Sequence, residues 1–168
     1  MSIAIYPGSF DPMTMGHIHI AERACRIFDH VIIGVAIPNY KSSLFTLDER
    51  MEFLKEGIAH IPNCSVQVFD CLTVDFAKQV GAVAIIRGLR AISDYEYEMQ
   101  VAAINKYLAE GVETVFLMAN SEYSFLSSSI IKQVVSTGGK VTGLVTPRVE
   151  KALTAKLYEG KLKATENI

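Results

Sequence analysis

The chain has 168 residues, a formal net charge of −2 and a hydrophobic fraction of 50%. This length is enough for one domain with a sizeable core, the near-neutral charge argues against a nucleic-acid partner, and no apolar run approaches the roughly 20 residues of a membrane span. Met1 leads directly into an apolar segment without a basic region, so we expect no signal peptide. Cys25, Cys64 and Cys71 lack CxxC spacing, which predicts reduced thiols in a cytoplasmic protein rather than zinc ligands.

Short apolar segments rich in Val and Ile alternate with segments of helical spacing. Strands are predicted over 2–6, 31–37, 65–70, 82–87 and 114–119. Helices are predicted over 16–28, 47–60, 73–80, 94–109, 127–136 and 147–158. Nearly continuous apolar strands are typical of sheets that are buried on both faces. The alternation therefore predicts a single α/β domain over 1–168, built on an open, doubly wound, five-stranded parallel sheet, with a C-terminal helix over about 147–158 and a short tail.

Three predicted helices carry recognisable start signals. Residues 46–49 (TLDE) and 93–96 (SDYE) both have the pattern of a capping box, in which the first and fourth residues satisfy each other's backbone N–H groups. Pro147 suits the first turn of a helix, where its missing N–H costs nothing.

The loops that follow the five strands should carry the functional groups, because ligands of doubly wound sheets bind at the carboxyl ends of the strands. These loops read PGSFDPMTMGH, PNYKSSLF, DCLT, RGLRAISD and NSEYSFLSSS. Their basic and hydroxyl residues are Ser9, His17, Lys41, Arg87, Arg90 and Ser127–Ser129. Such groups gathered on one rim predict a polyphosphate ligand.

The first of these loops, within YPGSFDPMTMGHIHI (residues 6–20), is the most informative. Gly8 allows a sharp turn close to a ligand. Gly16 and His17 stand where a helix begins, and a helix N-terminus attracts phosphate. His17 can add an imidazole donor to an oxygen that gains charge. For a Gly-His pair alone, a turn beside a solvated histidine is the more ordinary interpretation, but the string T-x-G-H after a first strand favours the catalytic one.

Thr14 to His17 resembles the (H/T)-x-G-H signature of the nucleotidyltransferase superfamily. The segments YPGSFDPMTMGHI, FTLDERMEFL, IIRGLRAISDYEYEMQ and FLMANSEYSFLSSSIIKQV further resemble, in order and spacing, the phosphopantetheine adenylyltransferase family, from about residue 2 to about 158. The resemblance implies a Rossmann-like sheet, a homohexamer and a requirement for Mg²⁺. It also implies transfer of AMP from ATP to 4′-phosphopantetheine, giving dephospho-coenzyme A and pyrophosphate in the penultimate step of coenzyme A synthesis, with coenzyme A as a candidate feedback ligand.

The resemblance also assigns roles to residues. His17 matches the transition-state stabiliser. The phosphopantetheine side matches Ser9, Lys41, Thr73 and Arg87. The ATP side matches Ser9, Phe10, His17, Gly88, Leu89, Arg90, Glu98, Tyr123, Ser124, Phe125, Leu126, Ser127, Ser128 and Ser129. Ser9 stands where the family usually has Thr, and Tyr123 where it more often has Trp.

Lys132, which follows the serine run of the same rim, is a candidate phosphate contact. His19 lies two residues beyond His17, so it points elsewhere on a helix; we expect it to be solvated and assign it no role. No carboxylate cluster is visible in the sequence, so we expect Mg²⁺ to arrive with ATP, held mainly by phosphates and water.

The implied reaction agrees with the residue types. A phosphate monoester has a second pKa of roughly 6 and is largely a dianion at neutral pH, so the acceptor needs no base. What remains is positioning and electrostatic stabilisation.

Two alternatives stay open at this point. The first is another nucleotidyltransferase, acting on a nicotinamide nucleotide or a glycerol phosphate, which RGLR…YEYEMQ disfavours. The second is a non-catalytic nucleotide sensor of the same fold, which His17 together with Lys41 disfavours. A class I aminoacyl-tRNA synthetase is excluded by size and by the lack of an anticodon-binding module.

Overall fold

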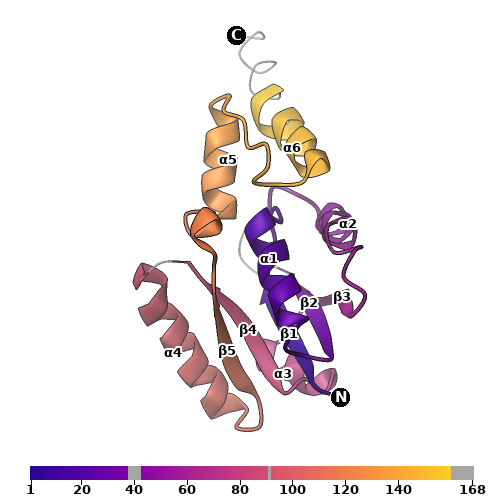
Figure 1. Cartoon of the computed structure of the whole chain (residues 1–168), viewed down its shortest axis with the longest axis vertical. Coiled ribbons are helices and arrows are strands. Elements are labelled where there is room, and N and C mark those ends of the chain that lie inside the picture. The colour runs from indigo at the N-terminus through magenta and orange to yellow at the C-terminus, as the bar shows by residue number, and fades with distance from the viewer. Residues whose placement is uncertain (38–42, 91, 160–168) are drawn as a thin grey trace.

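The structure, a computed structural model, describes residues 1–37, 43–90 and 92–159. Its centre is one parallel sheet with the strand order β3-β2-β1-β4-β5 (Figure 1). The strands are β1 (Ile3–Gly8), β2 (His30–Ala36), β3 (Cys64–Phe69), β4 (Ala84–Leu89) and β5 (Glu113–Met118). The predicted doubly wound α/β fold is confirmed, and each strand lies within two residues of its predicted range.

The order of the strands reverses between β1 and β4. The chain builds outward from β1 through β2 to β3 and then returns to place β4 on the other side of β1. β1 pairs along its whole length with β2, from Ile3 opposite His30 to Gly8 opposite Val35, but with β4 only at Ala4 and Ile5. The carboxyl ends of β1 and β4 therefore separate, and this separation opens a crevice at the reversal.

The helices follow the predicted order, with some changes at their ends. They are α1 (Met15–Ala24), α2 (Leu47–Gly57), α3 (Thr73–Gln79), α4 (Ile92–Leu108), α5 (Ser128–Ser136) and α6 (Pro147–Leu153). A short 3₁₀ turn, η1 (Ser121–Tyr123), precedes α5, and a wider π-type segment, η2 (Thr154–Glu159), continues α6. The prediction that the first helix extends to residue 28 is wrong, because α1 ends with Cys25 as its C-cap.

Two of the three predicted helix starts are confirmed. In α2, the Thr46 hydroxyl accepts from the Glu49 N–H at 3.2 Å and the Glu49 carboxylate accepts from the Thr46 N–H at 2.8 Å. Pro147 occupies the first turn of α6 behind the N-cap Thr146. The capping box predicted at 93–96 is wrong, because α4 already begins at Ile92 and Ser93 lies inside the helix. A Ser-x-x-Glu pattern inside a helix looks the same in sequence.

Two layers of apolar side chains hold helices against the sheet. α1 and α2 pack on one face through Ile18, Ala21 and Leu54 among others, against Tyr6, Ile33 and Ile86. α3 packs on the other face, where Val74 and Phe76 meet Ile5, Ile32 and Ile85, and α4 lies beside α3 on that face. The alternation of buried side chains along each strand thus fills both layers.

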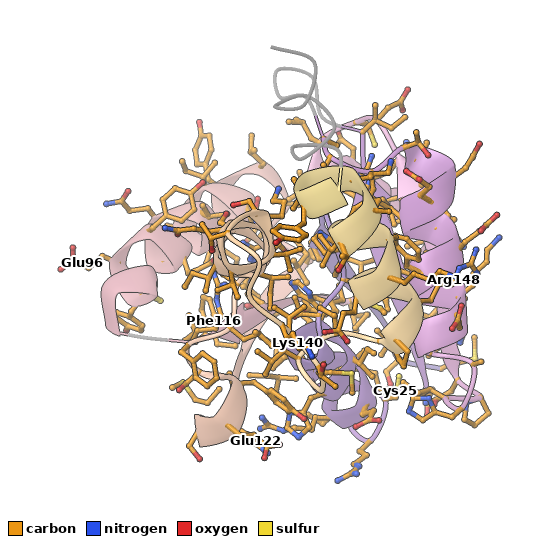
Figure 2. All side chains as sticks on the ribbon, turned by 90° about the horizontal axis from the view of Figure 1, so that it is seen from above. Cys25, Glu96, Phe116, Glu122, Lys140 and Arg148 are labelled. Carbon is orange, nitrogen blue, oxygen red and sulfur yellow. The ribbon has the colours of Figure 1, made fainter. Side chains whose placement is uncertain are left out.

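A third apolar cluster lies beyond the carboxyl ends of the strands, at the top of Figure 1. α5 and α6 meet there through Ile131, Val135, Val149 and Leu153, together with Phe45 at the start of α2. Arg148, labelled in Figure 2, adds an ion pair from α6 to two glutamates of α2, Glu52 and Glu56. The C-terminal helices therefore extend the core past the sheet edge and support the segment that leads into α5.

The remaining global expectations concern thiols and membranes. Cys25, Cys64 and Cys71 are free thiols in the structure. In the part of the chain that the structure describes, no helix combines the length and apolar character that crossing a bilayer requires.

Candidate active site

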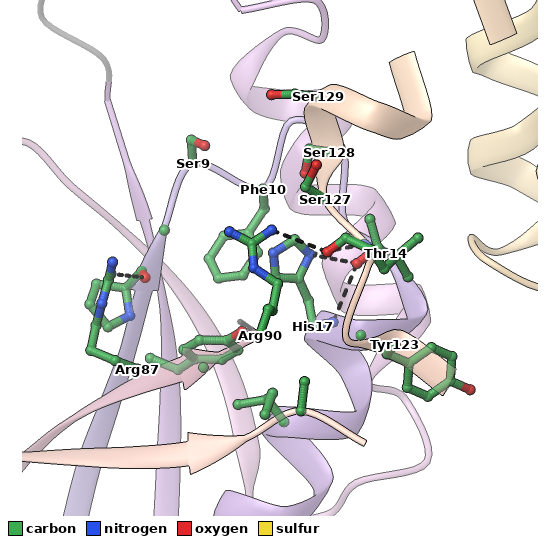
Figure 3. Close-up of a pocket in the computed structure, with 18 of the residues that line it drawn as sticks. Ser9, Phe10, Thr14, His17, Arg87, Arg90, Tyr123, Ser127, Ser128 and Ser129 are labelled. Atoms are coloured by element: carbon green, nitrogen blue, oxygen red, sulfur yellow. Dashed lines mark hydrogen bonds between the residues drawn. The ribbon is translucent and has the colours of Figure 1, made fainter. Parts of the chain in front are cut away.

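A cavity of about 410 Å³ opens at the crevice between β1 and β4. Its walls come from the end of β1, the start of α1, the end of β4, one residue of α4 and the segment from β5 to α5 (Figure 3). Segments far apart in sequence thus meet at the predicted rim of the sheet.

Most of the predicted ATP-side residues line this cavity. They are Ser9, Phe10, His17, Gly88, Arg90, Glu98, Tyr123, Leu126, Ser127, Ser128 and Ser129, and Arg87 from the phosphopantetheine side joins them. The structure therefore brings most of the predicted ATP-side residues, and Arg87, together around a single space.

Of the predicted site residues that the structure describes, four are not among the cavity walls. Leu89 is buried and does not line the cavity, although Gly88 and Arg90 on either side of it do. The Ser124 hydroxyl donates to the Ser121 carbonyl within the local turn, and Phe125 is 58% exposed. Thr73 begins α3 after the edge strand β3, two strands away from the crevice. Lys41 lies outside the described residues.

The loop after β1 folds its phenylalanine inward. Phe10 is 3% exposed and adopts a positive φ of 48°, which is uncommon for a bulky residue. Its ring packs edge-on against Tyr6, with centroids 5.5 Å apart, and against His17, at 5.1 Å. A Cβ on Gly8 would lie 3.0 Å from this ring. Gly8 therefore leaves room for the Phe10 ring, and it also lines the cavity, where a close approach to a ligand was predicted for it.

A buried carboxylate that the sequence analysis missed anchors the same loop. Asp11 is 7% exposed and accepts hydrogen bonds from the backbone N–H groups of Leu44 and Phe45, both at 2.9 Å. It also pairs with Lys132 of α5 at 3.2 Å. Lys132 was a candidate phosphate contact; in the structure it pairs with Asp11 and does not line the cavity. Asp11 thus ties the β1–α1 loop to the start of α2 and to α5.

A buried arginine of α2 is hydrogen-bonded to the backbone of this loop. Arg50 is 3% exposed, and its guanidinium donates to the carbonyl of Ser9 at 2.8 Å and to that of Ala36 at 3.3 Å. These bonds join the ends of β1 and β2. No signal in the sequence indicated this role of Arg50, because its burial depends on contacts with segments distant in the chain.

His17 stands at the start of α1 as the fourth residue of a capping box. Its backbone N–H donates to the Thr14 hydroxyl at 3.4 Å, and its Nδ1 accepts from the Thr14 backbone N–H at 3.0 Å. Burial, and next the positive charge of Arg90, lower the pKa of His17 from its usual 6.5 to about 4. The imidazole is therefore neutral at physiological pH.

The segment after β4 supplies charge. The Arg87 guanidinium makes a two-pronged ion pair with Glu98 of α4, at 2.7 Å and 2.6 Å, and this pairing raises the pKa of Arg87. Arg90 donates to the carbonyl of Leu126 at 3.1 Å. Two arginines and one carboxylate leave this wall of the cavity positive. Such a wall suits a phosphate chain.

The segment before α5 supplies hydroxyl groups and a helix N-terminus. Ser127 is the N-cap of α5, and its hydroxyl accepts from the Ile130 N–H at 3.1 Å. The Ser128 hydroxyl donates to the carbonyl of Pro12 at 2.7 Å, and Ser129 also lines the cavity. The capping and ligand-facing interpretations of this serine run are thus compatible.

Neighbours of the predicted residues complete the walls. Tyr6, Pro7, Gly8, Thr14, Gly16, Ile20 and Ala119 line the cavity without having been assigned as site residues. Tyr6 lies two residues before Gly8 on β1, and burial raises its pKa, so its phenol stays neutral.

His19 differs from the expectation of a solvated side chain. It does not line the cavity, as its position on the helix indicated. However, it is half-buried: its Nε2 lies 3.1 Å from the Asn120 amide, its Nδ1 is buried, and its ring contacts Tyr123 at 5.6 Å. It packs α1 against the segment before α5.

A doubly wound sheet whose strand reversal carries a T-x-G-H helix start and a positive, hydroxyl-rich cavity defines a nucleotidyltransferase-type domain. A family model described as cytidylyltransferase-like matches residues 5–134 and places the chain in this class.

Relatives identify the family within this class. The chain is 56% identical to the phosphopantetheine adenylyltransferase of Moorella thermoacetica over 91% of the chain and 96% of that protein. It is 51% identical to the protein of that name from Thermodesulfovibrio yellowstonii, over 90% and 95%, and 50% identical to the one from Geotalea daltonii, over 93% and 97%. The chain belongs to the phosphopantetheine adenylyltransferase family.

Proposed function

We propose that the protein transfers AMP from ATP to 4′-phosphopantetheine, giving dephospho-coenzyme A and pyrophosphate. The observation that carries the proposal is the cavity at the β1–β4 reversal, where a neutral imidazole, two arginines and the serine-capped start of α5 converge. The shared name of the relatives, at 50% identity and above, supports phosphopantetheine as the acceptor.

The proposed mechanism is direct in-line attack by the acceptor phosphate on the α-phosphate of ATP. The acceptor is largely a dianion at neutral pH and needs no base. The N–H groups of Ser127–Ser129, the hydroxyls of Ser127 and Ser129, and the Arg90 guanidinium hold the phosphate chain. The neutral His17 donates a hydrogen bond to an α-phosphate oxygen that gains charge in the transition state, so it stabilises that state more than the ground state.

The acceptor side of the proposal combines Arg87 with Lys41 and Thr73. Arg87 lines the cavity and is held in place by Glu98. Lys41, outside the described residues, is proposed to bring the acceptor phosphate toward ATP. Thr73 lies on the β3 side of the rim, where it can contact only the pantetheine arm, the long part of the acceptor that extends from the phosphate.

We propose that Mg²⁺ arrives with ATP. Across the described residues, no group of three or more His, Cys, Asp or Glu side chains is arranged to hold a metal ion, and Glu98, the carboxylate at the cavity, is paired with Arg87. This donor set fits a metal that is held mainly by phosphate oxygens and water. When bound, the ion would neutralise phosphate charge.

We propose a homohexamer as the assembled state. α4 exposes large apolar side chains, with Tyr97 65%, Ile104 60% and Tyr107 89% exposed, and Met118 after it on β5 is 59% exposed. A surface of this kind favours contact between copies. Sedimentation in dilute buffer tests the assembly, and a single species near 18.5 kDa would contradict it. Feedback by coenzyme A and a cytoplasmic location stay predictions.

The test of the function is pyrophosphate release from MgATP with different acceptors. We expect release with 4′-phosphopantetheine and none above background with a nicotinamide mononucleotide, glycerol 3-phosphate or no acceptor. Release with either of the other two acceptors would instead favour a different transferase of the same class. ATP binding without release for any acceptor would indicate a nucleotide sensor.

A further inference from the structure

The same capping box opens two helices of this protein with different residues in its fourth position. In α2 that residue is Glu49, the usual type for this motif, and its carboxylate accepts the Thr46 N–H at 2.8 Å. In α1 it is His17, and the imidazole Nδ1 accepts the Thr14 N–H at 3.0 Å. Glu49 lies outside the cavity wall, whereas His17 is part of it.

This contact determines where the imidazole carries its proton. A backbone N–H can only donate, so the Nδ1 that faces it must present a lone pair. A neutral imidazole with a lone pair on Nδ1 carries its single proton on Nε2. The Thr14 hydroxyl, 3.1 Å from the same nitrogen, can add a second donor. A proton on Nδ1 would instead point a donor at the Thr14 N–H.

We propose that Thr14 is a positioning residue whose backbone N–H and hydroxyl hold His17 as the Nε2–H tautomer, so that the cap of α1 prepares the hydrogen-bond donor of the active site. The tautomer follows from the contacts alone, whereas its catalytic value rests on the proposed function. Thr14 is 2% exposed, which fixes the cap in place. Figure 3 shows Thr14 and His17 joined by these contacts at the edge of the cavity.

The surroundings of His17 keep this single form over a wide pH range. Phe10 and Tyr6 pack against the ring from β1 and its loop, and burial keeps the Tyr6 phenol neutral. From the β4 side, Arg90 opposes a positive imidazole, while Arg87 is neutralised by Glu98. The start of α1 also disfavours a cation, because its N–H groups carry partial positive charge. A neutral donor in such a site needs no change of protonation during the reaction.

The first test measures the tautomer without any substrate. Nitrogen-15 spectra of the four histidine side chains of the full chain are recorded from about pH 5.5 to about pH 8, and His17 is assigned by the signals missing in His17→Gln. We expect a pyridine-type Nδ1 and a pyrrole-type Nε2 throughout. A pyrrole-type Nδ1, or a ring that becomes cationic in this range, would overturn the proposal.

The second test separates the cap from the donor by substitution. His17→Asn places an oxygen where Nδ1 lies and keeps the cap without a donor at the Nε2 position. His17→Gln can both cap and donate, and His17→Ala does neither. We expect kcat of His17→Gln to exceed that of His17→Ala by about tenfold or more, and His17→Asn to be as slow as His17→Ala. The Tm of His17→Ala should fall by about 2–4 °C, whereas His17→Asn should stay near the wild type.

The third test uses the second capping box as a matched control. Thr14→Val and Thr46→Val each remove one capping hydroxyl, so both should lower Tm by about 2–4 °C. We expect kcat to fall about 3- to 10-fold in Thr14→Val, because the ring loses its hydroxyl contact at Nδ1, and to recover in Thr14→Ser, while Thr46→Val keeps kcat. The Nε2–H tautomer should persist in Thr14→Val, because the backbone N–H at residue 14 remains.

The outcomes distinguish the two levels of the proposal. Equal activity of His17→Asn and His17→Gln, or equal effects of Thr14→Val and Thr46→Val on kcat, would overturn the positioning role even if the spectra are as expected. A wild-type kcat in His17→Ala would contradict the proposed function of His17 and leave the tautomer assignment standing.

Discussion

The two walls of the cavity that come from β1–α1 and from β4–α4 are held by different forces. On the β1–α1 side, the groups that face the cavity are neutral: the His17 imidazole, the Phe10 ring beneath it and the Tyr6 phenol. They are fixed by a capping box and aromatic packing. On the β4–α4 side, the groups are charged, and the Arg87–Glu98 pair holds them.

This difference indicates that the two walls of one crevice can have separate tasks, one in turnover and the other in binding. Neutral hydrogen bonds act over a short range and are little affected by salt, so they suit an oxygen whose charge changes only in the transition state. Arginine charges act over longer distances and are screened by salt, so they suit the capture of a polyanion. We expect perturbation of the first wall to change turnover and perturbation of the second to change binding.

The largest effect should come from removing the donor of the neutral wall. His17→Ala should lower kcat by about 10²–10³, or roughly 3–4 kcal/mol of transition-state stabilisation, with only a modest change in ATP affinity. Single-turnover kinetics and calorimetric titration of ATP measure the two quantities. If turnover stays within a few fold of the wild type, or if the loss is mainly in ATP affinity, the assignment of turnover to the β1–α1 wall and of binding to the β4–α4 wall is wrong.

The next largest effect should come from removing Asp11, the buried carboxylate that anchors the β1–α1 loop. Asp11→Ala should lower the free energy of unfolding by about 2–4 kcal/mol, because it leaves two backbone N–H groups and Lys132 without their acceptor. Denaturant unfolding provides the measurement. Glu52→Ala, which removes an exposed ion pair with Arg148, is the control and should cost less than about 1 kcal/mol. Equal losses in both variants would contradict the buried role of Asp11.

The smallest effect should come from screening the charged wall. Raising NaCl from about 0.05 M to about 0.5 M should weaken ATP binding about 3-fold or more, because salt screens the charge of Arg90. The turnover number at saturating substrates should change less than about twofold, because His17 carries no charge. Initial rates at several salt concentrations separate the two. A salt-sensitive kcat with a constant ATP affinity would reverse the assignment of the walls.

Local patterns in the sequence were sufficient to predict the fold and to indicate which edge of the sheet carries the candidate site. Apolar segments that alternate with segments of helical spacing predict the strands. The carboxyl ends of parallel strands lie at one edge of the sheet, even where the predicted ends of a strand are wrong by a residue or two. Thr46 and Glu49 predict their cap because both partners lie within one helical turn. The same reasoning finds the loop that contains His17 and the serine run at 127–129.

Contacts between distant segments could not be predicted in this way. Asp11 meets Lys132, Arg87 meets Glu98, and His19 meets Asn120 only because segments apart in the sequence come together in the fold. Burial of Arg50 likewise depends on where α2 crosses β1 and β2. The spacing of residues along the chain carries no information on such contacts. His19, which was expected to be solvated, and Lys132, a candidate phosphate contact, therefore contact other side chains of the protein instead.

The third apolar cluster has a practical consequence for handling the protein. Val149 and Leu153 of α6 are fully buried against α5, and the ring of Tyr158 lies 3.0 Å from where a Cβ on Gly138 would sit. α5 begins with the serines that line the cavity. An affinity tag or reporter fused at the C-terminal side should therefore be attached after residue 159, because a fusion that replaces α6 would remove the support of the serines that line the cavity.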